Sequence, residues 1–118
     1  MKRSPLKTKP NKIKSKRFAE QYHSAEFVCW IHGHPCSTRI PGILCDYWPI
    51  HESVASHVSK SKGAGGTWRD VAPQCEKCHR ELHQKGPATF CQARGWPLER
   101  LSELAAGYAR EWEAICQP

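Results

Sequence analysis

Apolar residues recur at helical spacing in two stretches of the chain. In the first, they follow Ser24, a residue type that caps helix N-termini, and the pattern predicts a helix to about His32. In the second, Pro97 precedes a long amphipathic stretch, which predicts a C-terminal packing helix over about 97–116. The expected buried residues are Phe27, Val28 and Ile31 in the first helix, and Leu98, Leu101, Leu104 or Ala105, Tyr108, Trp112 and Ile115 in the second.

Short strands and turns are expected between these helices. Residues 53–58 predict a strand, and the loop that follows contains three glycines, which are too flexible for the interior of an element. Residues 68–72 predict a second strand, which Pro73 stops because it lacks a backbone N–H donor. A further helix is expected to begin near Cys75 and to end at Gly86.

Composition bounds the size of the core. Only 39% of the 118 residues are apolar, and nine prolines and eight glycines interrupt the chain. The length suits one domain, and the composition suits a thin core of the kind that small proteins reinforce with a metal ion or with disulfides. We therefore expect a single domain over residues 18–118.

Positive charge is concentrated at the N-terminus. Residues 1–17 contain eight Lys and Arg and no acid, whereas in residues 18–118 ten Lys and Arg face eleven acids. The low apolar content of residues 1–17 predicts a disordered basic tail. Such a tail attracts phosphate by releasing counterions, although it would equally increase solubility without binding anything.

The seven cysteines indicate metal ligands rather than disulfides. Their number is odd, and the basic N-terminus has none of the apolar character of a secretory signal. No apolar run approaches the length of a membrane span. We expect a cytoplasmic protein, and in a reducing cytoplasm a Cys-x-x-Cys pair beside histidine is typical of a metal site.

A structural zinc site is predicted from four of these cysteines. Cys75 and Cys78 have the spacing that directs two thiolates to one ion. A tetrahedral site needs two further ligands, and Cys36 and Cys45 lie on the turn-rich segment upstream. We expect these four residues to hold Zn2+.

The other candidate ligands are less suitable but include two histidines. Cys29 lies in the apolar run of the first helix and is expected to be buried. Cys91 and Cys116 lie in helical or apolar context with no neighbouring ligand. His32 and His34 remain open as alternatives to one of the four cysteines.

A second kind of cluster is formed by histidines. His79 and His83 are four residues apart on the expected helix, so both side chains project from one face and can share an ion. Two ligands leave positions open for water and a phosphate oxygen, as a catalytic metal requires. Alternatively, one of the two completes the zinc site. His57, at the end of the first strand, is a candidate general base.

Together these features resemble the HNH, or ββα-metal, endonuclease family. The similarity covers about residues 35–86. It rests on Ser-His-Val at 56–58, Gly-Ala-Gly-Gly at 63–66, Asp-Val-Ala-Pro at 70–73 and Cys-x-x-Cys-His-x-x-x-His at 75–83. Residues 36–45 are similar to the first zinc knuckle of small prophage-encoded members. The resemblance implies a small α+β fold with a zinc-stapled, treble-clef ββα-metal core, an N-terminal helix and a C-terminal packing helix.

The resemblance also implies a role for each site residue. The family's strand histidine, its general base, corresponds to His57. Asp70 corresponds to the Asn or Asp that hydrogen-bonds the loop carrying the base or touches the metal. His79 and His83 correspond to the ligands of a catalytic divalent ion, expected to be Mg2+ or Mn2+. One departure is Ser56, which stands where many members have an Asp or His metal ligand.

The implied activity is metal-dependent hydrolysis of DNA phosphodiester bonds by a one-metal mechanism. DNA is the expected partner, and the host cytoplasm the expected location if a phage encodes the chain. Lys60, Lys62 and Arg69 flank the site and would hold backbone phosphates, although exposed loop cations are often only solvated.

Two other functions remain open. One is a non-catalytic, zinc-containing module that binds nucleic acid through its tail. The other is an accessory protein of phage recombination or packaging in which nuclease residues persist as relics. His57 and the open His79/His83 pair favour the nuclease, because binding alone would not need them, whereas Ser56 is the one hint of a relic.

Overall fold

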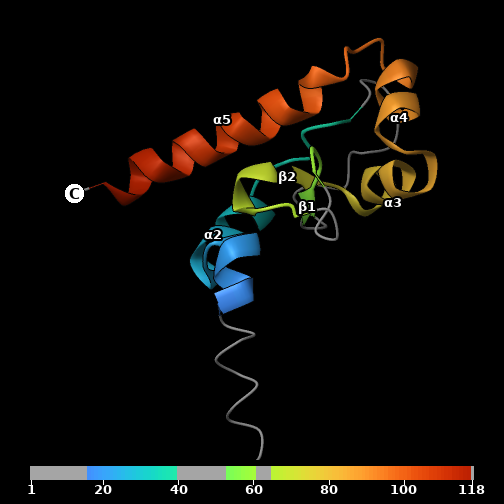
Figure 1. Ribbon diagram of the computed structural model, residues 1–118. Helices are drawn as coiled ribbons and strands as arrows, with labels where there is room; N and C mark the ends of the chain where they lie inside the picture. The colour runs from blue at the N-terminus through green and yellow to red at the C-terminus, as the bar shows by residue number, and fades with distance from the viewer. Residues whose placement is uncertain (1–15, 40–52, 61–64, 118) are drawn as a thin grey trace, which may run out of the picture.

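Helices surround a two-stranded hairpin in the computed structural model, which describes residues 16–39, 53–60 and 65–117 (Figure 1). In chain order the elements are α2 (Ala25–His32), β1 (Val54–His57), the 3-10 helix η3 (Trp68–Asp70), β2 (Val71–Gln74), α3 (Glu76–Lys85), α4 (Pro87–Ala93) and α5 (Glu99–Cys116). The chain therefore has the small α+β fold that the sequence predicted. Over the described residues, every helix is too short or too polar to cross a bilayer.

The predicted first helix is confirmed, but a second helix precedes it. The Ser24 hydroxyl accepts a hydrogen bond from the Phe27 N–H at 3.1 Å, which caps α2 at its N-terminus. Residues 16–22 are also helical, so residues 16 and 17 do not belong to a disordered tail as predicted. His23 joins the two helices with a φ of 68°, a conformation more typical of glycine. The other residues assigned to the tail lie outside the described residues.

The second strand begins and ends later than predicted. Residues 68–70 form η3, and β2 runs through Pro73. The Pro73 carbonyl accepts hydrogen bonds from Ser37 rather than from β1. A residue's N and O point to the same side in an antiparallel strand, so the missing N–H of Pro73 faces away from β1 and the ladder between the strands stays intact.

The two faces of the hairpin pack against different helices. β1 pairs with β2 in antiparallel register, with Ser56 opposite Ala72 and His57 opposite Val71. Val71 packs in one cluster with residues of α2, whereas Ala72 packs in another with residues of α3. Because side chains alternate along a strand, Ser56 lies on the α3 face and His57 on the α2 face.

A short helix that the sequence pattern did not reveal follows α3. Gly86 ends α3 with a φ of 84°, which glycine adopts without a steric penalty. Pro87 then starts α4 at once, because its fixed φ suits the first helical position. Phe90 and Cys91 are the buried residues of this helix.

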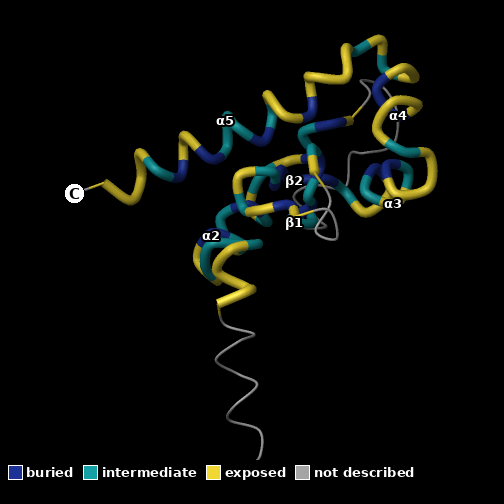
Figure 2. The backbone as a smooth tube through the Cα atoms, in the orientation of Figure 1, coloured by how far each residue is buried: buried dark blue, intermediate teal, exposed yellow. Residues whose placement is uncertain are grey.

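The C-terminal helix α5 covers both clusters, as predicted for a packing helix. In Figure 2 its buried positions lie on the side that faces the hairpin, and its exposed positions lie on the opposite side. Leu101 and Ala105 join the cluster beneath α3 and α4, and Trp112 joins the cluster beneath α2. The predicted face is wrong at its two ends, because Leu98 and Ile115 are 55% and 57% exposed.

Aromatic rings fill the cluster between α2, η3 and α5. The Phe27 ring is fully buried and lies 5.4 Å from the Trp68 ring, 5.6 Å from Trp112 and 6.0 Å from Trp30, centroid to centroid. The core therefore extends well beyond residues 35–86, to which the family resemblance is limited.

Replacing the central ring should strongly destabilise the protein. We expect Phe27→Ala to lower the free energy of unfolding by about 3–5 kcal/mol, because it leaves a cavity among these rings. The exposed Cys29→Ala on the same helix is the matched control and should change it by about 0.5 kcal/mol or less. Urea unfolding followed by far-UV circular dichroism measures both, and equal losses would contradict this account of the core.

Candidate functional site

Three cysteine thiols converge where the turn after α2 meets the start of α3. Cys75 is the N-cap residue of α3, and its sulfur accepts a hydrogen bond from the Cys78 N–H at 3.3 Å. The sulfur atoms of Cys36, Cys75 and Cys78 lie within 4.8 Å of one another. Sulfur ligands of a tetrahedral zinc ion are about 3.8 Å apart, given Zn–S bonds of about 2.3 Å. This thiol cluster could therefore hold a metal ion such as zinc.

Hydrogen bonds to β2 hold the turn that carries Cys36. The Ser37 N–H and hydroxyl both donate to the Pro73 carbonyl, at 2.8 and 2.7 Å. One residue later, the Gln74 side-chain amide donates to the Thr38 hydroxyl at 2.9 Å, and that hydroxyl lies 3.6 Å from the Cys36 sulfur. Apart from their closeness to Cys36, nothing in the sequence predicts these roles of Ser37 and Thr38.

The environment of Cys36 favours its thiolate. The pKa of this thiol is lowered from 9.0 to about 5, mainly by its hydrogen bond with the Cys78 thiol. Burial acts in the opposite direction and raises the pKa, whereas weaker hydrogen bonds with the Cys75 main chain and with Thr38 lower it further. Because the thiolate is the form that binds metal, the cluster is suited to a cation at neutral pH.

No fourth candidate ligand joins the three thiols among the described residues. Cys45, predicted for that position, lies outside them. Within residues 16–39, 53–60 and 65–117, no histidine or carboxylate joins the three thiols. The alternatives His32 and His34 are therefore not brought to the cluster, and His34 instead donates from Nδ1 to the Trp30 carbonyl at 2.7 Å. The same holds for the alternative in which His79 or His83 completes the site.

The remaining described cysteines lie elsewhere. The prediction that Cys29 is buried is wrong, because its position on α2 faces solvent, away from Phe27 and Ile31. Cys116 is also exposed. Cys91 is buried in the hydrophobic core, and burial raises the pKa of its thiol.

His79 and His83 lie side by side on α3, as their spacing predicted. Their ring centroids are 4.4 Å apart, and His79 is half-buried while His83 is exposed. The pKa of His79 is lowered, first by burial and then by the nearby charge of His83, against an opposite effect of Glu76. A lowered pKa keeps the imidazole neutral, which is the form that binds metal.

Ser56 reaches across from β1 to this pair. Its side chain is buried, and its hydroxyl lies 2.9 Å from Nδ1 of His79, within hydrogen-bonding distance. This hydrogen bond orients the His79 ring and uses Nδ1, so that Nε2 is the nitrogen not engaged by Ser56. Within the described residues, no third Cys, His, Asp or Glu completes a ligand group with the pair.

His57 is not brought to the histidine pair. It is the last residue of β1 and faces the helix at 16–22, where its Nε2–H donates to the Gln21 carbonyl at 2.8 Å. Its ring also meets the Tyr22 ring edge to face, with centroids 4.9 Å apart. A ring whose Nε2 carries the proton has its lone pair on Nδ1.

Asp70 holds the loop that follows β1. One carboxylate oxygen accepts a hydrogen bond from the Ser59 hydroxyl at 2.8 Å, and the other accepts one from the Thr67 N–H at 2.8 Å. In addition, the Val58 N–H donates to the Asp70 carbonyl at 2.9 Å. These bonds fix the backbone just after His57.

The predicted phosphate contacts differ in their surroundings. Lys60 is exposed, and Lys62 lies outside the described residues. Arg69 is exposed too, but its guanidinium pairs with Glu113 on α5 and lies 4.5 Å from the centroid of the Trp68 ring. A phosphate would compete with Glu113 for this guanidinium.

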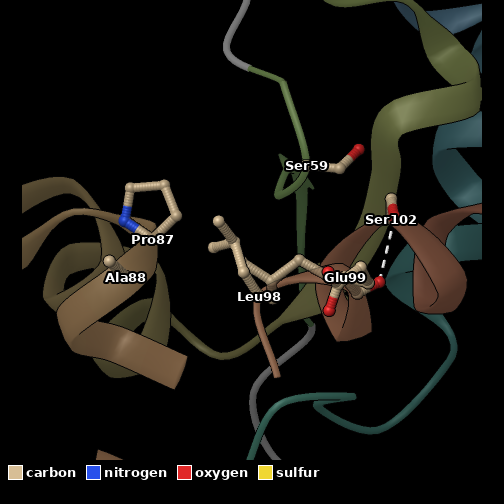
Figure 3. Close-up of a pocket in the computed structure, with 7 residues that line it drawn as sticks. Ser59, Pro87, Ala88, Leu98, Glu99 and Ser102 are labelled. Carbon is tan, nitrogen blue, oxygen red and sulfur yellow. Dashed lines mark hydrogen bonds between the residues drawn. The ribbon is translucent and has the colours of Figure 1, made fainter. Parts of the chain in front are cut away.

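A hollow of about 410 Å3 lies beside this region, between the starts of α4 and α5 (Figure 3). Leu98 projects into it opposite Pro87 and Ala88, and Ser59 borders it. Among the described residues, its lining contains no cation and no histidine. The histidine pair is therefore the better candidate site.

No known protein family, curated protein or solved structure matches this chain.

Removing one clustered thiol should release the metal and unfold the chain. We expect Cys78→Ser to lose bound zinc and most of its folded structure, since zinc binding contributes about 10–16 kcal/mol to folding in small zinc domains. Cys116→Ser, which removes an exposed thiol, should keep both. Zinc content per chain and far-UV circular dichroism are the measurements, and a cooperatively folded, zinc-free Cys78→Ser protein would overturn the assignment.

Proposed function

We propose that the protein is a metal-dependent endonuclease that hydrolyses DNA phosphodiester bonds, with the zinc-stapled, treble-clef ββα-metal core of the HNH family. The observation that carries the proposal is the pair His79 and His83 on the face of α3 that meets β1, with the Ser56 hydroxyl on Nδ1 of His79. A structural role alone would not require two adjacent imidazoles at a partly open surface.

Two different ions fit the two clusters. The thiolates of Cys36, Cys75 and Cys78, with Cys45 as the fourth ligand, suit zinc. His79 and His83 would hold a separate divalent ion that, when bound, stabilises the developing charge on the phosphate and the leaving 3′-oxygen. Imidazole favours transition ions, whereas Mg2+ prefers oxygen ligands. We therefore expect Mn2+ to support activity better than Mg2+.

Ser56 would act by orienting a ligand rather than by binding the ion. When the Ser56 oxygen accepts a hydrogen bond from Nδ1–H, the lone pair of the neutral His79 ring is on Nε2. Partners of this kind fix the tautomer and orientation of metal-binding histidines. This role would explain how a serine can stand where many family members have an Asp or His ligand.

His57 would act as the general base that takes a proton from the attacking water. Its Nε2–H donates to the Gln21 carbonyl, which holds the ring in one orientation at the end of β1. Asp70 would keep the loop after β1 in place. His57 and His79 lie on opposite faces of the hairpin. The attacking water would therefore have to be bound at the end of β1, where both side chains could reach it.

The alternatives are a non-catalytic, zinc-containing nucleic-acid-binding module and an accessory protein of phage recombination or packaging. Two observations favour a non-catalytic role. His57 and His79 lie on opposite faces of the hairpin, and no third ligand joins the histidine pair within the described residues. DNA binding through the basic tail would need neither a base close to the histidine pair nor a third metal ligand.

Nicking of supercoiled plasmid DNA tests the proposed function. We expect activity with Mn2+ and a loss of about 100-fold or more in His83→Ala, because the exposed imidazole contributes to the ion and little to folding. The matched control is Gln84→Ala, the next exposed position on α3, which should cut like the wild type. His57→Ala should lose about 100- to 10,000-fold if this histidine is the base.

The outcomes separate the two candidates. A wild-type protein that binds zinc and DNA but is inert with Mg2+, Mn2+, Ni2+ and Zn2+ would sink the nuclease proposal and leave the binding module. If activity survives His57→Ala but not His83→Ala, the assignment of His57 as the base is wrong and the proposed metal site is still supported.

Deleting residues 2–15 should weaken DNA binding and flatten its salt dependence. The deletion removes six Lys and Arg, and the slope of log K against log salt falls by up to about 0.9 for each phosphate that the protein no longer neutralises. Fluorescence anisotropy at several salt concentrations measures the slope. A full-length variant with the same six residues changed to Gln should match the deletion, and an unchanged slope would leave the tail without a role in DNA binding.

A further inference from the structure

A buried arginine lies against the thiol cluster, and the proposed reaction does not use it. Arg94 directly follows α4, and only 2% of its side chain is exposed. Its guanidinium forms a double hydrogen bond with the Glu81 carboxylate, at 3.0 and 3.1 Å. It also donates to the Phe90 carbonyl at 3.2 Å, and its carbon lies 3.6 Å from the centroid of the Phe90 ring.

Two further bonds of the same guanidinium reach the two sides of the cluster. Nε–H donates to the Thr38 carbonyl at 2.6 Å, two residues after Cys36. The terminal nitrogen donates to the Cys78 sulfur at 3.5 Å. One rigid, planar group therefore joins the turn that carries Cys36 to the helix that carries Cys78.

We propose that Arg94 is a positioning residue of the metal site: it sets the distance between the Cys36 turn and α3, and it supplies a positively charged N–H donor to the Cys78 sulfur. The inference rests on the proposed zinc site and not on the proposed nuclease reaction. Glu81 then serves to hold the guanidinium in place.

Hydrogen-bond accounting at Thr38 supports this role. The Thr38 carbonyl accepts from Arg94 and lies 3.9 Å from the Cys78 sulfur, whose one proton is shared between this carbonyl and Cys36. A thiolate bound to metal has no proton to donate, so Cys78 gives up this bond when it becomes a ligand. Arg94 remains as a donor to Thr38, and the buried carbonyl keeps a partner in both forms.

Charge supports the role as well. A zinc ion with three or four thiolates carries a net negative charge, which is unfavourable where water is excluded. Cys78 is 2% exposed, and Arg94 provides a charged donor directly at its sulfur. Removing a hydrogen-bond donor to a metal-coordinating side chain commonly changes metal affinity by about 10- to 100-fold.

The alternative is that Arg94 and Glu81 form an ion pair that stabilises only the fold. The two roles differ in what the removal of Glu81 does. Glu81→Gln eliminates the ion pair but leaves Arg94 able to donate to Thr38 and Cys78. Arg94→Gln eliminates both.

The experiment compares zinc affinity in the full chain by competition with a chromophoric chelator, with far-UV circular dichroism as the check on folding. We expect Arg94→Gln to bind zinc about 10- to 100-fold more weakly than wild type, and Glu81→Gln to lose less than about tenfold. Arg94→Lys keeps the charge without the planar fork and should lie between them. In Co2+-loaded protein, the thiolate-to-cobalt absorption band should shift in Arg94→Gln and stay in place in Glu81→Gln.

Each outcome decides the inference. Equal zinc affinity and equal Co2+ spectra in wild type and Arg94→Gln would overturn it, as would equal losses in Arg94→Gln and Glu81→Gln. If Arg94→Gln does not fold, the comparison of Arg94→Lys with Glu81→Gln decides in the same way. A wild type that binds no zinc would overturn the zinc site and this inference together, whereas absent nuclease activity would affect neither.

Discussion

The contact between the Cys36 turn and the start of α3 is the constraint on which the rest of the structure depends. Cys36 precedes Cys75 by a long stretch of chain, yet their sulfurs lie within 4.8 Å of each other. Closing such a loop has an entropic cost that a thin core offsets poorly. A metal ion would offset it at one point. Once that point is fixed, α3 lies against the hairpin and His79 meets Ser56.

The pleat of the hairpin has a second consequence for the site. Adjacent residues of β1 face opposite helices, so Ser56 contacts His79 while His57 contacts the helix at 16–22. The metal-binding and proton-accepting functions, if the protein is a nuclease, are thus divided between two faces of a sheet only two strands wide. The two functions can act on one substrate only at the end of β1, where side chains no longer alternate between the two faces.

Local patterns in the sequence were reliable where one residue dictates a backbone conformation. Ser24 capped α2, Gly86 ended α3, and the spacing of His79 and His83 placed their rings together. The strand containing Pro73 was misplaced, because a strand tolerates proline wherever the missing N–H faces away from the partner strand, and the sequence alone does not show that direction. The burial of Cys29 was misjudged for a similar reason, since a short apolar run does not say which side of the helix meets the core.

Contacts between distant segments left no signal in the sequence. Nothing near Arg94 points to Cys78, and nothing near Gln21 points to His57. The Gln21 carbonyl has a wider consequence. It lies outside the HNH-like residues 35–86 and sets the tautomer of a histidine inside them. The motif is therefore not a portable module: transferred alone to another scaffold, it would lose the main-chain carbonyl to which His57 donates.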